Sequence, residues 1–391
     1  MRLPEPPQSY FLSALPMRWL MATALWLGIS ACGGGSSEAA APAVAPKITT
    51  LNSSLASPWS MVFLPSGELL VSQRGGSLVR LSADFKTATA ISGILPVNTS
   101  GQGGLLGLAL DPDFATAPWV YWSFSEPGTG SENGLTGTSV ARGRLVGNAL
   151  QGVSVVFRQQ PKTSGSNHYG SRLVFARDKT LFITTGERQL GSPAQDLQQT
   201  LGKVVRIQRD GSIPSDNPVF ATPALPGIWS LGHRNVQGAV LHPDTSELWT
   251  SEHGPQGGDE INIDRAGANY GWPVKSYGCN YGDPVGDACR IGGGVHAPNY
   301  VEPLTYWVPT SIAPAGLLFY TGNLIPQWKG NLFSGSLAGQ ALWRMTVSPN
   351  AVLTREALLT DLHERIRDVT QAPYGAILLL TDSGKLLRLG P

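Results

Sequence analysis

The residue types best suited to chemistry gather in the middle of the 391-residue chain, between residues 229 and 272. Arg234 and Asn235 are adjacent there, and the turn Gly254-Pro255 comes shortly before Asp259. An arginine presents a planar set of donors that suits carboxylates, and an asparagine adds a donor and an acceptor. A Gly-Pro turn cannot continue a strand, so its carbonyl oxygens need other partners, either a hard cation such as calcium or water. The segment predicts a binding site, with a solvated hairpin loop as the alternative.

Three further motifs carry polar residues in predicted connections or at strand ends. Gln102 lies in G-Q-G-G-L-L-G-L, and His168 directly precedes a predicted strand in N-H-Y-G-S-R-L-V-F. An imidazole suits acid-base chemistry near neutral pH, whereas a histidine taken alone is more often structural. Arg365 and Arg367 in R-I-R-D are expected on one side of a strand, because strand side chains alternate. Salt bridges to the carboxylates that flank this pair in sequence are the alternative.

Composition excludes several classes of protein. Only 14% of the residues are charged and the net charge is +1, so no basic surface is available for nucleic acid. The 47 glycines and 30 prolines favour many short strands joined by turns, and no long amphipathic helix is predicted. The spacing of His233, His242 and His253 argues against a zinc hydrolase.

A local pattern recurs along the chain: an apolar residue, a turn rich in Pro, Asp, Ser or Gly, and an apolar strand. Six copies are present, starting at Phe63, Leu110, Phe175, Leu241, Pro326 and Ala372. Several copies are followed by a second similar strand, such as S-L-V-R-L ending at Leu81. Recurrence of one β unit predicts an all-β, six-bladed propeller with long inter-strand loops over residues 48–391. A β-sandwich is the alternative, but it does not require six similar units.

The N-terminal residues are expected to target the protein rather than to fold with it. A positive residue, an apolar run and small residues precede Cys32, which indicates a lipoprotein-type signal peptide over residues 1–32, with an ordinary signal peptide as the alternative. Residues 33–47 predict a flexible tether. The chain is therefore expected to be exported and held by a lipid on Cys32 at the periplasmic side of a bacterial membrane, the outer one.

The remaining two cysteines, Cys279 and Cys289, form an even pair in a compartment that permits disulfides. They flank a loop inside the long segment 276–299, and a bridge between them would limit its conformations. Two free thiols are the alternative.

Five motifs in order carry a family resemblance: N-H-Y-G-S-R-L, L-G-H-R-N-V-Q-G, S-E-H-G-P-Q-G-G-D-E-I-N, A-N-Y-G-W-P and R-I-R-D-V. From about residue 48 onward the chain resembles the soluble pyrroloquinoline quinone-dependent sugar dehydrogenases of the glucose/sorbosone dehydrogenase family. The H-G-P-Q-G-G-D-E form is most similar to the bacterial aldose sugar dehydrogenase branch.

The resemblance implies a role for each matching residue. His168 would be the base that takes the proton of the sugar C1 hydroxyl. Arg234 and Asn235 would lie beside the quinone oxygens, where positive charge stabilises the reduced cofactor. Arg365 and Arg367 would bind cofactor carboxylates.

The resemblance also implies a calcium ion on the main-chain carbonyls of Gly254 and Pro255, and places Gln102 and Asp259 near the sugar. One position departs from the glucose-oxidising members, which carry a cofactor-binding lysine where this chain has Ala338.

The function expected from the resemblance is oxidation of an aldose at C1 to its lactone. Hydride would pass to pyrroloquinoline quinone with calcium present, and electrons would go on to an unidentified periplasmic acceptor. A monomer is expected. A calcium-dependent propeller lactonase and a non-catalytic, lipid-anchored binding propeller are the alternatives.

Overall fold

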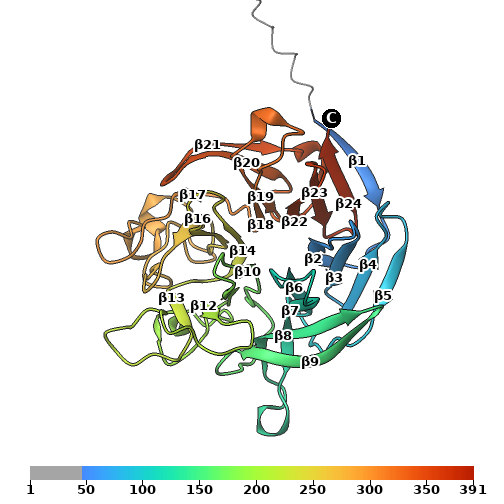
Figure 1. Ribbon diagram of the computed structural model, residues 1–391. Coiled ribbons are helices and arrows are strands. Elements are labelled where there is room, and N and C mark those ends of the chain that lie inside the picture. The colour runs from blue at the N-terminus through green and yellow to red at the C-terminus, as the bar shows by residue number, and fades with distance from the viewer. Residues whose placement is uncertain (1–45) are drawn as a thin grey trace, which may run out of the picture. The chain divides into compact units, whose positions relative to one another are not determined.

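Six four-stranded antiparallel sheets make up the fold in the computed structural model, which describes residues 46–391. The sheets are arranged like blades around a common axis, with one strand of each next to the axis (Figure 1). These inner strands, β2, β6, β10, β14, β18 and β22, contact one another in turn around the ring. The predicted six-bladed propeller is confirmed.

The strands of the first three blades are β2 (Pro58–Phe63), β3 (Leu69–Gln73), β4 (Ser77–Leu81), β5 (Ala88–Ile91); β6 (Leu105–Leu110), β7 (Trp119–Pro127), β8 (Thr136–Val146), β9 (Ala149–Arg158); and β10 (Leu173–Phe175), β11 (Leu181–Thr184), β12 (Lys203–Ile207), β13 (Ile228–Leu231). The strands of the fourth and fifth blades are β14 (Val236–Leu241), β15 (Leu248–Glu252), β16 (Asp259–Asp264), β17 (Thr305–Trp307); and β18 (Pro314–Phe319), β19 (Leu332–Ser336), β20 (Leu342–Ser348), β21 (Ala351–Leu358). The sixth blade contains β22 (Ile366–Gln371), β23 (Ile377–Thr381), β24 (Leu386–Gly390) and β1 (Lys47–Asn52).

The repeated sequence pattern marks the connection between the first two strands of each blade. Phe63, Leu110, Phe175 and Leu241 are the last residues of β2, β6, β10 and β14, and Ala372 directly follows β22. The less regular fifth copy, at Pro326, forms a short helix before β19. Each repeat is thus a blade, because a single sheet must bury both faces against its two neighbours.

The core lies between adjacent blades. One cluster packs Leu70 and Leu78 of the first blade against Leu108 and Trp122 of the second. Strands β3 and β23 are buried along their whole length. This explains why both sequences begin with a continuous apolar run, at residues 69–71 and 377–380, rather than alternating.

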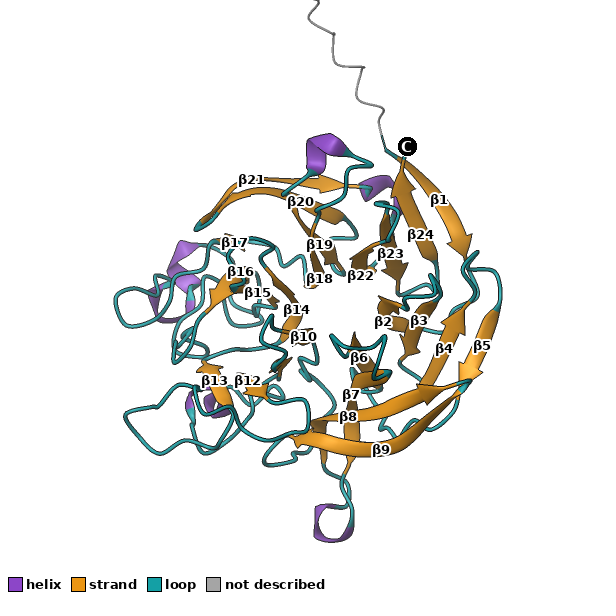
Figure 2. Ribbon diagram, in the orientation of Figure 1, coloured by secondary structure: helices purple, strands orange, loops and turns teal. Residues whose placement is uncertain are grey.

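Helices are confined to connections (Figure 2). They are the 3-10 helices η1 (Gly130–Glu132), η2 (Ser192–Gln195), η3 (Asp287–Cys289), η4 (Ile291–Gly293), η5 (Pro326–Trp328) and η6 (Thr360–Leu362). Over residues 46–391, no helix has the length and apolar character needed to cross a membrane.

The ring is closed by strands from the two ends of the described chain. β1 pairs antiparallel with β24, so that Ile48 lies opposite Leu389 and the sixth blade takes its outermost strand from the N-terminal side. The predicted signal peptide with Cys32, and the tether up to residue 45, lie outside the described residues.

Removal of β1 should therefore weaken the whole ring. A chain that begins at residue 54 is expected to lose about 3–5 kcal/mol of unfolding free energy, from roughly four or five strand hydrogen bonds at about 1 kcal/mol each. Urea unfolding followed by tryptophan fluorescence measures the difference. A chain that begins at residue 46 is the control, and equal stability of the two would contradict closure by β1.

Candidate functional site

The predicted site residues come together at one end of the propeller axis. Gln102, His168 and Arg234 each precede the inner strand of a blade, and Arg367 lies near the start of another inner strand. Because the inner strands surround the axis, their starting ends converge. A hollow of about 260 Å³ lies there, lined by Trp59, Arg74, Gln102, Gln237, His253, Ala313, Leu337, Arg365, Arg367 and Asp382.

Arg365 and Arg367 point to the same side, as the alternation in R-I-R-D predicts. Both bind Asp382, with Nε to oxygen distances of 2.9 Å for Arg365 and 2.8 Å for Arg367. Burial alone would raise the pKa of Asp382, but the two arginines hold that pKa below its ordinary value. Arg74 adds a third guanidinium to the lining. Three cations against one carboxylate favour an anionic ligand.

The carboxylates next to this pair in sequence bind elsewhere. Glu364 accepts a hydrogen bond from Lys385 at 2.6 Å, and Asp368 pairs with buried Arg172 at 2.8 Å. The alternative of salt bridges within R-I-R-D is wrong, because strand alternation turns Asp368 away from the arginines.

His168 is buried and oriented by a carboxylate. Its Nδ1 lies 2.7 Å from Glu187 Oε1, and its backbone N–H donates to Gln102 Oε1 at 2.9 Å. Burial lowers the pKa of His168 and nearby Arg234 lowers it further, while Glu187 opposes both. The ring is therefore neutral near pH 7, and donation from Nδ1 to Glu187 leaves Nε2 as a free base.

Glu187 was not recognised in the sequence. It follows β11 in T-T-G-E-R, a loop without a distinctive motif. Its second oxygen accepts from the backbone of Gly191 at 2.7 Å, and its own N–H donates to the carbonyl of Arg234 at 2.9 Å. Glu187 thus joins the histidine to the arginine through one loop.

Arg234 and Asn235 are almost completely buried, yet each keeps an unpartnered donor. Arg234 donates from Nη1 to the His253 carbonyl at 3.2 Å and from Nη2 to the Tyr281 hydroxyl at 3.0 Å. Asn235 accepts from the backbone of Gly170 at 3.1 Å. Arg234 Nε and Asn235 Nδ2 find no acceptor among the described residues. Both donors are therefore available to a ligand that reaches this end of the propeller axis.

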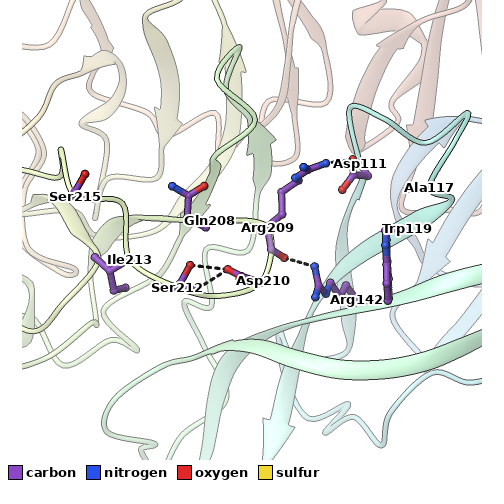
Figure 3. Close-up of a pocket in the computed structure, with 10 residues that line it drawn as sticks. All are labelled: Asp111, Ala117, Trp119, Arg142, Gln208, Arg209, Asp210, Ser212, Ile213 and Ser215. Atoms are coloured by element: carbon purple, nitrogen blue, oxygen red, sulfur yellow. Dashed lines mark hydrogen bonds and ion pairs between the residues drawn. The ribbon is translucent and has the colours of Figure 1, made fainter.

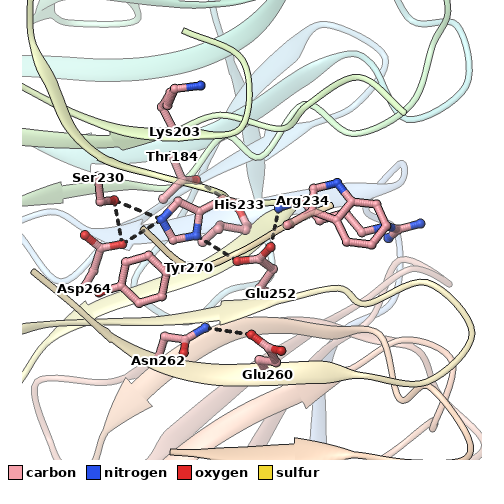
Figure 4. Close-up of polar contacts among 12 residues, drawn as sticks. Thr184, Lys203, Ser230, His233, Arg234, Glu252, Glu260, Asn262, Asp264 and Tyr270 are labelled. Atoms are coloured by element: carbon pink, nitrogen blue, oxygen red, sulfur yellow. Dashed lines mark hydrogen bonds and ion pairs between the residues drawn. The ribbon is translucent and has the colours of Figure 1, made fainter. Parts of the chain in front are cut away.

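A buried ionic cluster supports Arg234 from behind (Figure 4). His233 lies between two carboxylates, 2.8 Å from Glu252 and 3.1 Å from Asp264, and stacks on the Tyr270 ring. Burial opposes protonation of His233, but the two carboxylates outweigh it and raise its pKa to about 9. Glu252 also accepts the backbone N–H of Arg234. The cluster therefore fixes the backbone from which the arginine projects.

Asp259 binds the backbone of the Gly254-Pro255 turn. It is fully buried, and Oδ1 accepts from the Gly254 N–H at 2.8 Å. Oδ2 accepts from the Ser311 hydroxyl and the backbone of Ile312 and Ala313. Both carboxylate oxygens thus accept hydrogen bonds from within the chain, and the position of Asp259 near the sugar stays a prediction. Asp259 shapes the turn and the loop opposite.

The Gly254-Pro255 turn presents free carbonyl oxygens. Neither carbonyl accepts a hydrogen bond from a residue that the structure describes. A Cβ on Gly254 would come within 2.3 Å of the Gly257 carbonyl oxygen, so only glycine fits this turn. The residue before it, His253, lines the hollow and donates from Nε2 to the Pro314 carbonyl at 2.8 Å. Burial lowers the pKa of His253 to about 3, so this ring is neutral.

Ala338 is exposed beside the hollow, and its neighbour Leu337 supplies the lining. No side chain replaces the lysine of the glucose-oxidising members at this position. Cys279 and Cys289 form the predicted disulfide.

A wider hollow of about 730 Å³ lies elsewhere, between the second and third blades (Figure 3). Asp111 in its wall follows the last residue of β6, whereas Gln102 precedes the first, so it lies at the opposite end of the inner strands. Arg209 pairs with Asp111 at 3.0 Å, and Arg142 lies over the Trp119 ring. This hollow contains none of the site residues predicted from sequence.

Comparisons with known proteins identify the family of the chain. Residues 55–388 match the glucose/sorbosone dehydrogenase family. The chain is 39% identical to an aldose sugar dehydrogenase of Escherichia coli K12 over 98% of this chain and 99% of that one. A crystal structure of a glucose dehydrogenase, 43% identical, matches with a TM-score of 0.83 over 88% of this chain and all of that one. The PQQ-bound aldose sugar dehydrogenase of Streptomyces coelicolor, 30% identical, matches with a TM-score of 0.72 over 90% and 99% of the two chains.

The buried cluster around His233 should contribute to the free energy of unfolding. His233→Gln leaves Glu252 and Asp264 without their cation, so we expect a loss of about 3–5 kcal/mol of unfolding free energy at pH 7. The folded-state pKa of about 9 exceeds the unfolded value, so this contribution is complete below about pH 6.5 and disappears as pH rises through about 9.

Urea unfolding between pH 6 and pH 10 measures both effects. His242→Gln is the control, since His242 is buried but pairs with no carboxylate in the described chain. If the parent protein and the His233 variant showed the same pH dependence, the charged cluster would be excluded.

Proposed function

The chain belongs to the glucose/sorbosone dehydrogenase family, and we propose that it oxidises the C1 hydroxyl of aldose sugars to lactones, using pyrroloquinoline quinone and calcium. Its membership makes it a sugar dehydrogenase, an oxidoreductase. The observation that carries the finer proposal is the neutral, carboxylate-held His168 next to the unpartnered donors of Arg234 and Asn235.

The arginines that line the hollow and the nearby donors of Arg234 and Asn235 fit an anionic cofactor. Arg365 and Arg367 would hold its carboxylates, a geometry for which guanidinium groups are suited. Arg234 Nε and Asn235 Nδ2, the two buried donors without partners, would receive its oxygens. Pyrroloquinoline quinone, when bound, supplies an electron-deficient carbonyl that accepts hydride and later releases the electrons to an external acceptor.

His168 supplies the proton chemistry. Its Nε2 would take the proton of the sugar C1 hydroxyl as that carbon is oxidised, and Glu187 would stabilise the imidazolium that forms. Gln102 accepts the backbone N–H of His168, which fixes the ring at the edge of the hollow. Burial prevents the imidazole from being protonated before substrate arrives, because it lowers the pKa.

The Gly254-Pro255 turn fits one side of a calcium site. Its two free carbonyl oxygens are hard ligands of the kind that calcium prefers. Asp259 would act by holding the turn, since its carboxylate already accepts four hydrogen bonds. Calcium there would add positive charge next to Arg234 and so favour reduction of the cofactor.

The observations favour this proposal over the two alternatives. A propeller lactonase needs a metal held by carboxylates, and residues 46–391 contain no group of three or more His, Cys, Asp or Glu side chains arranged for one. A binding propeller has no use for a base oriented by Glu187 next to a buried cation.

Dye-linked oxidation of an aldose panel tests the function. The purified protein should be active only when pyrroloquinoline quinone and calcium are both added, and the product should be the lactone. His168→Gln should lower kcat by about 10²–10⁴-fold, the usual contribution of a general base, while binding of the cofactor measured by fluorescence stays unchanged.

Glu187→Gln is the matched partner variant. Because Glu187 raises the pKa of His168, its replacement should move the acid limb of the kcat/KM profile to lower pH and reduce kcat. Activity without the cofactor would refute the proposed mechanism. An unchanged kcat in the His168→Gln variant would refute it as well.

We further propose that the protein is exported and anchored by a lipid on Cys32. The signal-like sequence before Cys32 and the disulfide between Cys279 and Cys289, which suits an oxidising compartment, support this.

Mass spectrometry of the protein purified from bacterial membranes should find an N-terminal Cys32 carrying acyl chains. Cys32→Ser should release the protein into the soluble fraction. Recovery of an unmodified N-terminus elsewhere in the chain would exclude the anchor.

A further inference from the structure

Tyr281 is a large aromatic residue in an unusual position. Its side chain is 65% exposed, yet its hydroxyl lies 3.0 Å from Nη2 of Arg234, a residue that is only 4% exposed. The guanidinium lies 5.8 Å from the Tyr281 ring and 5.3 Å from the Trp272 ring. No ring of the described residues stacks on Tyr281. The ring therefore adds little to the core, and its hydroxyl contacts a buried residue of the candidate site.

The loop that carries Tyr281 is clamped on both sides of it. The disulfide between Cys279 and Cys289 closes the loop, and Cys279 exchanges two backbone hydrogen bonds of 3.0 Å with Gln256. The Gln256 side chain accepts from the Gly282 N–H at 3.1 Å and donates to the Asp283 carbonyl at 2.8 Å.

Gln256 itself directly follows the Gly254-Pro255 turn. The base of the loop is held by a second contact, in which Tyr277 stacks on Tyr306 with ring centroids 3.7 Å apart. These contacts reduce the conformational freedom of an exposed loop that is not part of the core. A loop ordered in advance loses less entropy when it binds a ligand.

We propose that Tyr281 is a specificity-determining residue that presents its ring to the sugar, and that the disulfide and Gln256 hold it there. The inference rests on the proposed function, since it assigns the sugar side of the same site. The apolar C–H face of a pyranose fits the electron-rich face of an aromatic ring. The Tyr281 hydroxyl, bound to Arg234, keeps that ring next to the reacting end of the site.

Three variants separate the ring from the hydroxyl and from the loop. Tyr281→Ala should raise KM for aldoses about tenfold, with kcat changed by less than about threefold. Tyr281→Phe keeps the ring but loses the hydroxyl contact with Arg234, and it should raise KM less than Tyr281→Ala does. Val285→Ala is the control, because Val285 is 55% exposed in the same disulfide-closed loop and should leave KM unchanged.

Cofactor binding provides a readout that does not depend on turnover. Fluorescence titration with pyrroloquinoline quinone should give the same Kd for the parent protein and Tyr281→Ala. If Kd rose and KM stayed constant, Tyr281 would act on the cofactor through Arg234, and the proposal would be overturned. An unchanged KM for every aldose tested would overturn it as well.

Removal of the disulfide by substitution tests the role of the loop. Cys279→Ser with Cys289→Ser should raise KM in the same direction as Tyr281→Ala, and the combined triple variant should show no further increase, because the two changes remove one contact. Additive effects would mean that the disulfide does not act through Tyr281.

The proposal can fail separately from the proposed function. If the parent protein oxidised no aldose, the function would fall, and calorimetric titration with D-glucose and maltose would still decide the role of Tyr281. Weaker sugar binding by Tyr281→Ala than by Val285→Ala would support a role of Tyr281 in sugar binding. Equal binding by the two variants, or no binding by the parent protein, would exclude that role.

Discussion

Closure of the ring is the constraint on which the rest of the structure depends. A blade buries both of its faces against neighbours, so six blades are stable only when the sixth meets the first. The pairing of β1 with β24 completes the sixth blade and joins the two ends of the described chain. Closure also brings the starting ends of all six inner strands around one axis. Residues that are far apart in sequence, such as Gln237 and Arg367, can then form a hydrogen bond of 2.8 Å.

The site depends on several buried charges, and each is neutralised by a partner from a different segment. Arg172 pairs with Asp368, Arg367 with Asp382, and His233 with Glu252 and Asp264. Such pairs add little to stability compared with apolar packing, and losing one partner is costly. Their benefit here is orientation, because they fix the groups around Arg234 while its Nε stays unpartnered. Donors held in advance of ligand binding need no rearrangement when charge develops.

The candidate site residues come from two parts of the chain, the rigid blades and a constrained loop. His168 and Arg234 project from the ends of core strands, where packing fixes their positions. The disulfide loop lies outside the blades and contacts Arg234 through Tyr281. Loops of this kind can change in sequence without disturbing the core. If His168 and Tyr281 act as we propose, oxidation and the choice of sugar are located on different parts of the chain.

The sequence alone determined the six blades, selected His168, Arg234, Asn235, Arg365 and Arg367 as candidate site residues, and identified Cys279 and Cys289 as a possible pair with free thiols as the alternative. These are local properties: a repeated turn, short motifs at strand ends, strand alternation and an even pair of cysteines. The tertiary structure decided the partners. It assigned Asp382 rather than Asp368 to the arginine pair, Glu187 to His168, and Tyr281 to Arg234. It also showed that Asp259 binds the backbone of the Gly254-Pro255 turn. Sequence spacing could not reveal these contacts, because the blades and the long connections meet only after the ring has closed.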